Sequence, residues 1–265
     1  MTGLQLGDQT ISGATGGRPL GDEGPLIMLV HGAAMDRTVW SLQTRWLAHH
    51  GCPTVAIDLP GHGASTEDER SSIEEYGEWL AALVDATARP VHVVGHSMGT
   101  FIALECALRT SVASLTLVGT AAGMPVHPSL LEAAQANDPL AAQLMSGWAF
   151  AHQTRSGPHP SPGGSMVGAT QAMLGQARPG VLGNDLAMCA VYEGAVDAAG
   201  AISSPLTLLL GAADRMTPVR AAQPVIDACP SAQVTVVPAV GHMVQIESPA
   251  VTRATIAAAL HAADV

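Results

Sequence analysis

One serine in this sequence stands in a spacing that favours nucleophilic catalysis. Ser97 has glycine two positions before it and two positions after it, in Gly95–Gly99, and the segment directly follows the apolar run Val91–Val94. A tight turn from a strand into a helix exposes such a serine above a sheet and strains its backbone. Glycines suit the flanking positions because a β-carbon there would collide with the neighbouring strand and helix. We therefore predict that Ser97 is a nucleophile.

A serine hydroxyl becomes a good nucleophile only with a base and an orienting acid. His242 follows the last apolar run of the chain, and Asp214 follows the run Leu206–Leu210. The histidine would remove the proton of Ser97, and the carboxylate would hold the imidazole in the correct tautomer. The rival position for the acid, after Leu115–Val118, carries no carboxylate. The order serine, aspartate, histidine therefore favours Asp214 and His242 as partners of Ser97.

Two backbone N–H groups are expected beside the nucleophile. Acyl transfer passes through an oxyanion, which preorganised N–H donors stabilise. The loop after Leu26–Val30 is built from small residues and contains Ala33, and Met98 opens the helix after Ser97. We predict that the N–H groups of Ala33 and Met98 form an oxyanion hole.

Two further histidines near these motifs are expected to be structural. His31 precedes the small-residue loop, where we expect it to form hydrogen bonds. The segment Asp58–Ser65 is interpreted as a tight turn that leaves a strand, with glycines in unusual backbone conformations. We expect His62, within this turn, to have no catalytic role.

The elements that must position these residues follow from short apolar runs. Such runs are rich in valine, leucine and isoleucine and have the length of strands that are buried on both faces; they are Leu26–Val30, Thr54–Ile57, Val91–Val94, Leu115–Val118, Leu206–Leu210 and Val234–Val237. Helical patterns lie between or after them, at Thr38–His50, Ile73–Ala88, Met98–Arg109, Pro218–Ala228 and Pro249–Ala262. The alternation predicts an α/β fold with a doubly wound, mostly parallel sheet and helices on both faces. Leu4–Ile11 is expected to add an antiparallel edge hairpin.

One region interrupts the alternation. Between residues 123 and 200 no strand is visible, and helical patterns occupy Pro128–His152, Met166–Gln176 and Asn184–Ala198. We predict a helical lid at 123–200, inserted between two parts of one core at 1–122 and 201–265. The length of 265 residues suits a single domain with an insertion.

Four bulky side chains are expected to line a substrate pocket. Met35 and Met243 adjoin the catalytic loops, and Trp148 and Tyr192 lie in the predicted lid. Methionine-rich walls favour an adaptable apolar site for a small to medium acyl or alkyl group. The alternative is that Trp148 and Tyr192 only pack the lid against the core.

Charge and composition narrow the expected partners. The formal net charge is −11, and an acidic surface repels phosphate backbones and anionic lipids. We expect a small-molecule substrate, no nucleic acid and no membrane, with a homo-oligomer as an open alternative. The four cysteines follow no metal or redox spacing, and the N-terminus lacks the pattern of a signal peptide. A cytoplasmic location is therefore expected.

The chain resembles the α/β-hydrolase family. The resemblance covers nearly the whole chain outside the predicted lid, and its motifs occur in family order at His31–Gly32, Asp58–Ser65, Gly95–Gly99, Asp214 and Gly241–His242. It implies an eight-stranded sheet, a lid over the site, a triad of Ser97, His242 and Asp214, and neither a cofactor nor a metal. A serine at the nucleophile position excludes the epoxide hydrolases and haloalkane dehalogenases, which use an aspartate.

The resemblance leaves several reactions open. The Gly-His-Ser-Met-Gly segment recurs in carboxylesterases, enol-lactone hydrolases and carbon–carbon bond hydrolases, and of these we expect a carboxylesterase that works through an acyl-enzyme. Enol-lactone hydrolysis, carbon–carbon bond hydrolysis or a lyase step on the same triad is the alternative, and a ligand-binding receptor is a more remote one. The carbon–carbon hydrolases usually carry a longer glycine- and proline-rich stretch after His-Gly, from which Ala33–Asp36 departs. An anionic substrate would need a nearby arginine, for which the candidates are Arg155, Arg178 and Arg215.

Overall fold

A seven-stranded sheet forms the centre of the molecule. The computed structural model describes residues 4–7, 9–21, 23–156 and 164–263. Within these residues the strand order is β3-β5-β4-β6-β7-β8-β9. The strands are β3 (Gly13–Ala14), β4 (Leu26–Val30), β5 (Thr54–Ile57), β6 (Val91–His96), β7 (Ser114–Val118), β8 (Leu206–Gly211) and β9 (Gln233–Val237). All neighbouring pairs are parallel except β3 and β5, so the prediction of a mostly parallel α/β sheet is confirmed.

The N-terminal hairpin differs from its expected place. Strands β1 (Leu4–Leu6) and β2 (Gln9–Ile11) form a separate antiparallel sheet, so the main sheet has seven strands in the described residues instead of the expected eight. At Gly7, whose φ is +60°, a β-carbon would lie 1.8 Å from the carbonyl oxygen of Ala86. The hairpin therefore packs against the end of a helix instead of extending the sheet.

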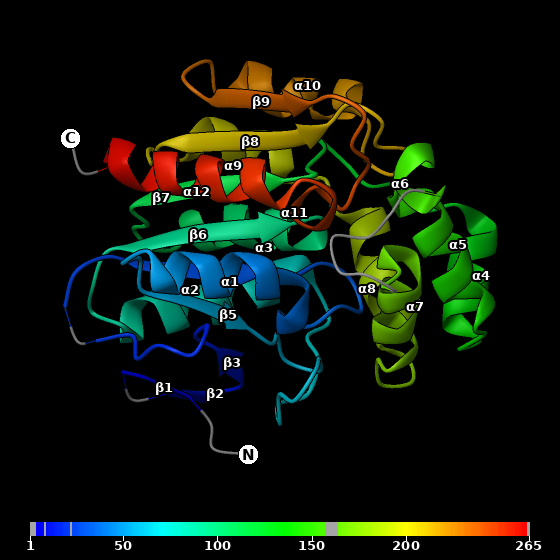
Figure 1. Ribbon diagram of the computed structural model, residues 1–265, viewed down its shortest axis with the longest axis horizontal. Coiled ribbons are helices and arrows are strands. Elements are labelled where there is room, and N and C mark those ends of the chain that lie inside the picture. The colour runs from blue at the N-terminus through cyan, green and yellow to red at the C-terminus, as the bar shows by residue number, and fades with distance from the viewer. Residues whose placement is uncertain (1–3, 8, 22, 157–163, 264–265) are drawn as a thin grey trace.

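Helices cover both faces of the sheet (Figure 1). On one face α1 (Ser41–His49) packs against α12 (Pro249–Ala263), and the short helices η1 (Arg37–Trp40) and α11 (Val244–Glu247) precede them. On the other face α2 (Ile73–Ala86), α3 (Met98–Ala107), α9 (Ala195–Ala201) and α10 (Val219–Ala228) pack in that order. This double cover explains why strands such as β4 and β7 are buried along their whole length.

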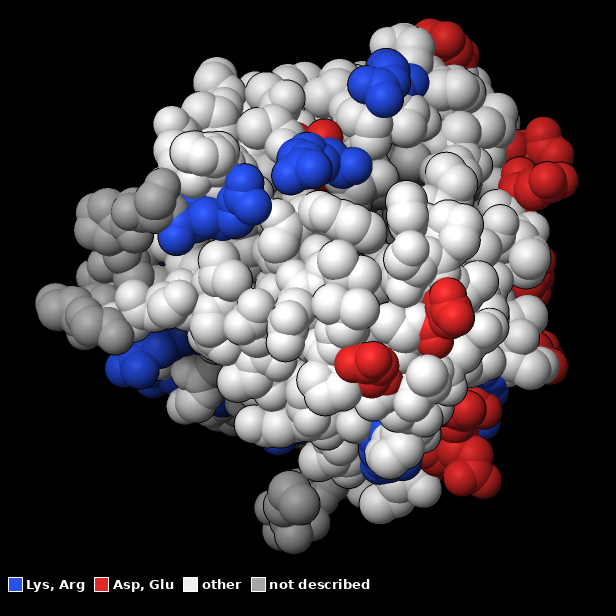
Figure 2. Space-filling model, turned by 90° about the vertical axis from the view of Figure 1, so that its right-hand side faces the viewer, with Lys and Arg blue, Asp and Glu red and all other residues white. Residues whose placement is uncertain are grey.

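Five helices lie beyond the carboxyl ends of the strands (Figure 1). They are α4 (Pro128–Gln135), α5 (Leu140–Ala149), α6 (His152–Ser156), α7 (Met166–Gly175) and α8 (Val181–Val191). The predicted pattern over 128–152 is divided because Asn137 adopts a φ of +54° and Pro139 follows. The surface of the molecule on this side has few charged residues near its centre (Figure 2).

The segment that is expected to be a third helical pattern, Asn184–Ala198, is divided between α8 and α9. Helix α9 contacts α3 and α10, so it belongs with the helices that cover the sheet. The helices over the strand ends are therefore α4–α8. Among the described residues, no helix combines the length and the apolar character that a bilayer span requires.

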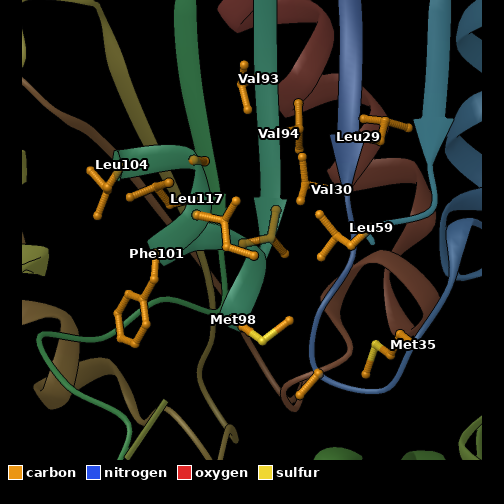
Figure 3. Packing of buried hydrophobic residues seen from close by; sticks show 14 of the residues in the cluster. Leu29, Val30, Met35, Leu59, Val93, Val94, Met98, Phe101, Leu104 and Leu117 are labelled. Atoms are coloured by element: carbon orange, nitrogen blue, oxygen red, sulfur yellow. The ribbon is translucent and has the colours of Figure 1, made fainter. Parts of the chain in front are cut away.

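The hydrophobic core extends to the carboxyl ends of the central strands. Val93 and Val94 of β6 pack beside Leu29 and Val30 of β4, and the side chain of Met98 lies just beyond the end of β6 (Figure 3). Met98 is fully buried. The turn that carries Ser97 is thus anchored on tightly packed elements.

Candidate active site

Ser97 occupies the turn between β6 and α3. Its backbone has φ 53° and ψ −123°, a conformation that non-glycine residues rarely adopt. The Ser97 N–H donates to the carbonyl oxygen of Val118 at 3.0 Å. The Ser97 carbonyl accepts the Thr100 N–H at 2.8 Å and the Thr100 hydroxyl at 2.7 Å. These bonds hold the strained residue at the edge of the sheet.

The glycines on either side of Ser97 allow close packing. A β-carbon at Gly95 would lie 2.2 Å from the carbonyl oxygen of Gly99. A β-carbon at Gly99 would lie 2.6 Å from the carbonyl oxygen of His31. A side chain at either position would push α3 away from β6 or from the end of β4.

His242 and Asp214 lie together in the loops after β9 and β8. The distance from His242 Nδ1 to Asp214 Oδ2 is 2.8 Å. Asp214 Oδ1 accepts the N–H groups of Met216 at 2.8 Å and of Thr217 at 2.9 Å, and the Thr217 hydroxyl donates to Asp214 Oδ2 at 2.8 Å. Burial would raise the pKa of Asp214, but the facing His242 and these hydrogen bonds lower that pKa to about 2. Asp214 is therefore a carboxylate that accepts the proton on His242 Nδ1.

The second ring nitrogen of His242 is free to act as a base. His242 Nε2 is buried and has no hydrogen-bond partner among the described residues. Ser97 and His242 line the same cavity. A nucleophile and its base often form their hydrogen bond only when substrate is bound. The arrangement can transfer a proton from Ser97 to His242 as Ser97 attacks a carbonyl.

His96 contacts the loop that carries His242, called the histidine loop below. Its Nε2 donates to the carbonyl oxygen of His242 at 3.1 Å, and the two ring centroids lie 4.8 Å apart. Burial, together with the charge of His242, lowers the pKa of His96 to about 3. His96 is therefore neutral at physiological pH and does not repel a protonated His242.

Glu247 ties the histidine loop to the helices over the strand ends. Its carboxylate accepts the Gly241 N–H at 2.9 Å and the Ala151 N–H at 3.0 Å. The N–H of His242 donates to the carbonyl oxygen of Ala149 at 2.7 Å. Burial raises the pKa of Glu247. The sequence alone does not predict these contacts, because nothing in the spacing of Glu247 distinguishes it from other acidic residues.

The loop after β4 passes directly beside the nucleophile. A β-carbon at Gly32 would lie 3.0 Å from Ser97 Cβ. Ala33 lines the cavity together with Ser97, and Met98 begins α3. Within the described parts of the chain, neither the Ala33 N–H nor the Met98 N–H donates to a protein acceptor. Two unpaired donors therefore flank Ser97.

The cavity above Ser97 has a volume of about 360 Å³. Its walls are mostly apolar and come mainly from the loop after β7 and from helices over the strand ends; they include Met124, Val126, Leu130, Met145, Trp148 and Leu186. Except for Trp148, these residues are not predicted from the sequence, because neither the loop nor the helices carry a motif that indicates which side faces the cavity.

The predicted pocket residues separate into two groups. Trp148 lines the cavity, and the ring of His127 lies 5.7 Å from it. The structure places Met35, Tyr192 and Met243 elsewhere, since none of them is among the residues that line this cavity. Helix α8 ends just before Tyr192, and the Tyr192 hydroxyl donates to Glu105 Oε1 on α3 at 2.6 Å. Tyr192 therefore lies against the helices that cover the sheet.

Met35 and Met243 are buried for a different reason. They are 3% and 0% exposed, so their side chains fill the core below the loops that carry them. Figure 3 shows Met35 on the loop after β4. Adjacency to a candidate catalytic loop does not place a side chain in the cavity, because neighbouring residues point in different directions.

One of the three candidate arginines reaches the cavity. Arg215 lines it and is exposed, with no acidic partner within the described ranges. Arg155 donates to the carbonyl oxygen of Gly147 at 3.1 Å, and Arg178 donates to that of Ser65. Among the described residues that line this mostly apolar cavity, Arg215 is the one arginine or lysine.

Two further kinds of reactive site, a thiolate and a metal centre, were considered near the cavity. Cys189 lines it, but burial raises the pKa of its thiol far above the usual value. In the part of the chain that the structure describes, no three histidine, cysteine, aspartate or glutamate side chains are grouped as metal ligands.

Comparisons with known proteins show which family the chain matches. The model of the Alpha/beta hydrolase family matches residues 27–255. A pimeloyl-[acyl-carrier protein] methyl ester esterase of Methylococcus capsulatus is 41% identical over 97 residues, which are 36% of this chain and 37% of that protein. Protein phosphatase methylesterase 1 of Mus musculus is 33% identical over 102 residues, 36% of this chain and 26% of that protein. The matches therefore span much less than two thirds of either relative.

A solved structure matches over a longer range. A thermophilic esterase from Thermogutta terrifontis, with malate bound, superposes with a TM-score of 0.79 at 25% identity, covering 91% of each chain. The family match spans most of the sequence and includes Ser97, Asp214 and His242. The resemblance that the motifs indicate is thereby confirmed, and the chain belongs to the alpha/beta hydrolase family.

Proposed function

We propose that this protein hydrolyses carboxylic esters with small to medium, largely apolar groups through an acyl-enzyme. The observation that carries the proposal is one cavity lined by both Ser97 and His242, with Asp214 on the far side of the imidazole. Its apolar walls suit an alkyl or acyl chain. The similarity to proteins that are named esterases supports the same class of reaction.

The reaction follows from the protonation states at the site. Ser97 Oγ attacks the ester carbonyl while His242 Nε2 accepts the hydroxyl proton, and Asp214 stabilises the imidazolium. The N–H groups of Ala33 and Met98 bind the oxyanion. His242 then gives its proton to the leaving alkoxide, and the alcohol departs.

The second half of the reaction releases the acid. Water enters the cavity, His242 Nε2 takes one of its protons, and the hydroxide attacks the acyl-enzyme carbonyl. The proton returns to Ser97 Oγ as the acyl–oxygen bond breaks. The enzyme is regenerated with no net change.

Helices α4–α8 are proposed to act as a lid over this site. Their side chains form much of the cavity wall, and they lie beyond the strand ends where Ser97 is exposed. Glu247 and the carbonyl of Ala149 connect the end of α5 to the histidine loop. We propose that the lid determines which acyl and alkyl groups fit.

A second candidate function is supported by Arg215. An arginine without an acidic partner in the described residues, at the wall of an apolar cavity, suits a substrate that carries a carboxylate. Half-esters of dicarboxylic acids, enol-lactones and keto acids cleaved at a carbon–carbon bond share this feature. The same triad serves each reaction.

Covalent labelling tests the proposed nucleophile. A fluorophosphonate is expected to add one adduct mass to the intact protein and to modify the peptide that contains Ser97. His242→Ala should slow the labelling by several orders of magnitude, because the base is lost. Labelling of another serine, or no labelling of folded protein, would contradict the proposal.

A further inference from the structure

A second histidine–aspartate pair lies outside the proposed triad. Asp185 on α8 is fully buried, and its Oδ2 lies 2.8 Å from His62 Nε2 and 2.7 Å from the backbone nitrogen of Ala34. The three residues come from the helices over the strand ends, from the loop after β5 and from the loop after β4. One carboxylate oxygen therefore joins three segments that are distant in sequence.

The contacts of His62 suit a charged ring. His62 Nδ1 lies 2.9 Å from the carbonyl oxygen of Pro60, which can only accept, and Nε2 faces the Asp185 carboxylate. Nδ1 must therefore donate, and Nε2 also donates when Asp185 is ionised. The groups that face this ring are Asp185, Asp58, His31 and Tyr76.

The facing Asp185 favours a charged His62. Burial would lower the pKa of His62, but the charge and the hydrogen bond of Asp185 raise it overall. In a charged pair the imidazolium and the carboxylate neutralise each other, so that neither buried charge is left alone.

His31 provides a contrast in the same cluster. Its Nδ1 lies 2.9 Å from the carbonyl oxygen of Gly32, and its Nε2 accepts the Leu59 N–H at 3.1 Å. One nitrogen donates and the other accepts, so this ring is neutral. Burial, aided by the charge of His62, lowers the pKa of His31 to about 3.

The Ala34 contact holds a strained turn. The Met35 N–H donates to the carbonyl oxygen of Gly32 at 3.1 Å, which closes a turn over Gly32–Met35. Ala34 has a φ of +52°, while Ala33 is not among the residues with positive φ. This is the type II arrangement, in which glycine is the usual third residue. A change to type I would turn over the peptide between Ala33 and Ala34 and remove the Ala34 N–H from Asp185.

We propose that Asp185 is a positioning residue for the oxyanion hole. Its carboxyl oxygen, which also contacts His62, accepts the Ala34 N–H and so holds the Gly32–Met35 turn, and with it the N–H of Ala33 one residue earlier, beside Ser97. Asp185 touches no reacting atom; it acts through the turn. The inference rests on the proposed function. Within the proposed lid, α8 would be the helix that contacts the loop with the oxyanion donors.

Two variants test this role. Asp185→Asn removes the charge that holds the Ala34 N–H. The pair Asp185→Asn with His62→Gln removes both charges together, so no unpaired buried charge destabilises the fold. Both are expected to lower kcat for p-nitrophenyl butyrate by about 10- to 100-fold, somewhat less than the loss of an oxyanion donor. KM should change by less than about threefold, because substrate binding does not use the oxyanion contact.

A trifluoromethyl ketone separates positioning from general damage. It forms a tetrahedral adduct with the serine, whose oxyanion needs the same donors. Its inhibition constant should rise by a factor similar to the fall in kcat, with active sites counted by fluorophosphonate titration. Glu105→Gln is the matched control, since Glu105 is also a buried carboxylate that accepts a hydrogen bond, from Tyr192. It should lower the melting temperature but leave kcat and inhibition unchanged.

The outcomes distinguish this inference from the proposed function. If folded Asp185→Asn or the folded double variant has the same kcat and inhibition constant as the wild type, the role of Asp185 is overturned while the esterase proposal stands. Loss of the proposed function itself would appear in the wild type, as absent labelling of Ser97.

The unmodified protein offers a test that requires no variant. Nitrogen-15 NMR of the histidine side chains at pH 7.5 should find protons on both ring nitrogens of His62 and on only one of His31. A single proton on His62 would overturn the ion pair and with it the proposal.

Discussion

The Nδ1 atom of His242 lies 2.8 Å from Asp214 Oδ2, while Nε2 of the same ring has no hydrogen-bond partner in the described residues. The carboxylate therefore determines which ring nitrogen carries the proton. Because the proton is on Nδ1, the nitrogen toward the cavity is the one that can accept the proton of Ser97.

This relationship predicts the effect of Asp214→Asn. The asparagine amide keeps the size of the side chain but can donate to Nδ1, which would move the proton to Nε2 and block the base. We expect kcat for p-nitrophenyl butyrate to fall by about 10⁴-fold with little change in KM. Steady-state kinetics on folded protein measures both values.

The matched control is Asp197→Asn, which changes an exposed aspartate on α9. It should have wild-type kinetics. An Asp214→Asn variant within tenfold of wild type would mean that another group orients His242.

Trp148 is expected to control chain length. It lines the cavity, so Trp148→Ala enlarges the apolar space near the substrate. The ratio of kcat/KM for p-nitrophenyl octanoate to that for the acetate should rise about five- to tenfold, because additional methylenes become buried. Trp46→Ala is the control, since Trp46 stacks on His50 away from the site. Unchanged preference in folded Trp148→Ala would show that Trp148 only packs the helices together.

Arg215 should distinguish charged from neutral esters. The mono-p-nitrophenyl ester of glutaric acid and p-nitrophenyl valerate form a suitable pair, because they have similar length but differ by one carboxylate. Arg215→Gln should lower kcat/KM for the charged ester about two- to fivefold relative to the neutral one, the range of an exposed ion pair. Arg220→Gln, on the neighbouring helix α10, should leave the ratio unchanged. An equal effect of Arg215→Gln on both esters would remove the support for an anionic substrate.

Buried neutral histidines should make stability depend on pH. The pKa values of His31 and His96 are lowered to about 3 in the fold by burial, whereas the ordinary value is about 6.5. Below about pH 6.5 the unfolded chain therefore binds protons that the native state does not, and stability falls as the pH drops toward 3. Each histidine contributes about 1.4 kcal/mol per pH unit within that window.

Urea unfolding between pH 6.5 and 4.5 measures this slope. His96→Asn removes one of the two groups and should make the free energy of unfolding less dependent on pH. His62 acts in the opposite sense, because its pKa is raised: its contribution is complete below about pH 6.5 and is lost as the pH rises through the raised value. A slope that His96→Asn leaves unchanged would contradict the assignment of His96 as a buried neutral ring.

Much of the sheet follows from the sequence because its strands are continuous apolar runs. The predicted bounds Leu26–Val30 and Thr54–Ile57 are those of β4 and β5. The run Val91–Val94 continues to His96, since Gly95 and His96 still pair with β7. The sequence does not predict β3, because its two small residues carry no periodic signal. They form a strand only through their pairing with β5.

The site divides in the same way. The residues of the proposed triad stand in local motifs at the ends of strands, so their types and order are enough to select them as candidates. Asp185 and His62 are 123 positions apart, and the packing of α8 alone brings them together. The cavity walls on α4, α5 and α8 follow from helix orientation, which a sequence without a clear amphipathic stripe does not specify.

Hydrolysis of p-nitrophenyl acetate, butyrate and octanoate by wild type and Ser97→Ala tests the central claim most directly. We predict steady-state turnover by the wild type and a loss of several orders of magnitude in the variant, with an unchanged melting temperature. Turnover that survives Ser97→Ala, or a folded wild type that is inert on all three esters, would contradict the assignment of Ser97 as the nucleophile of an esterase.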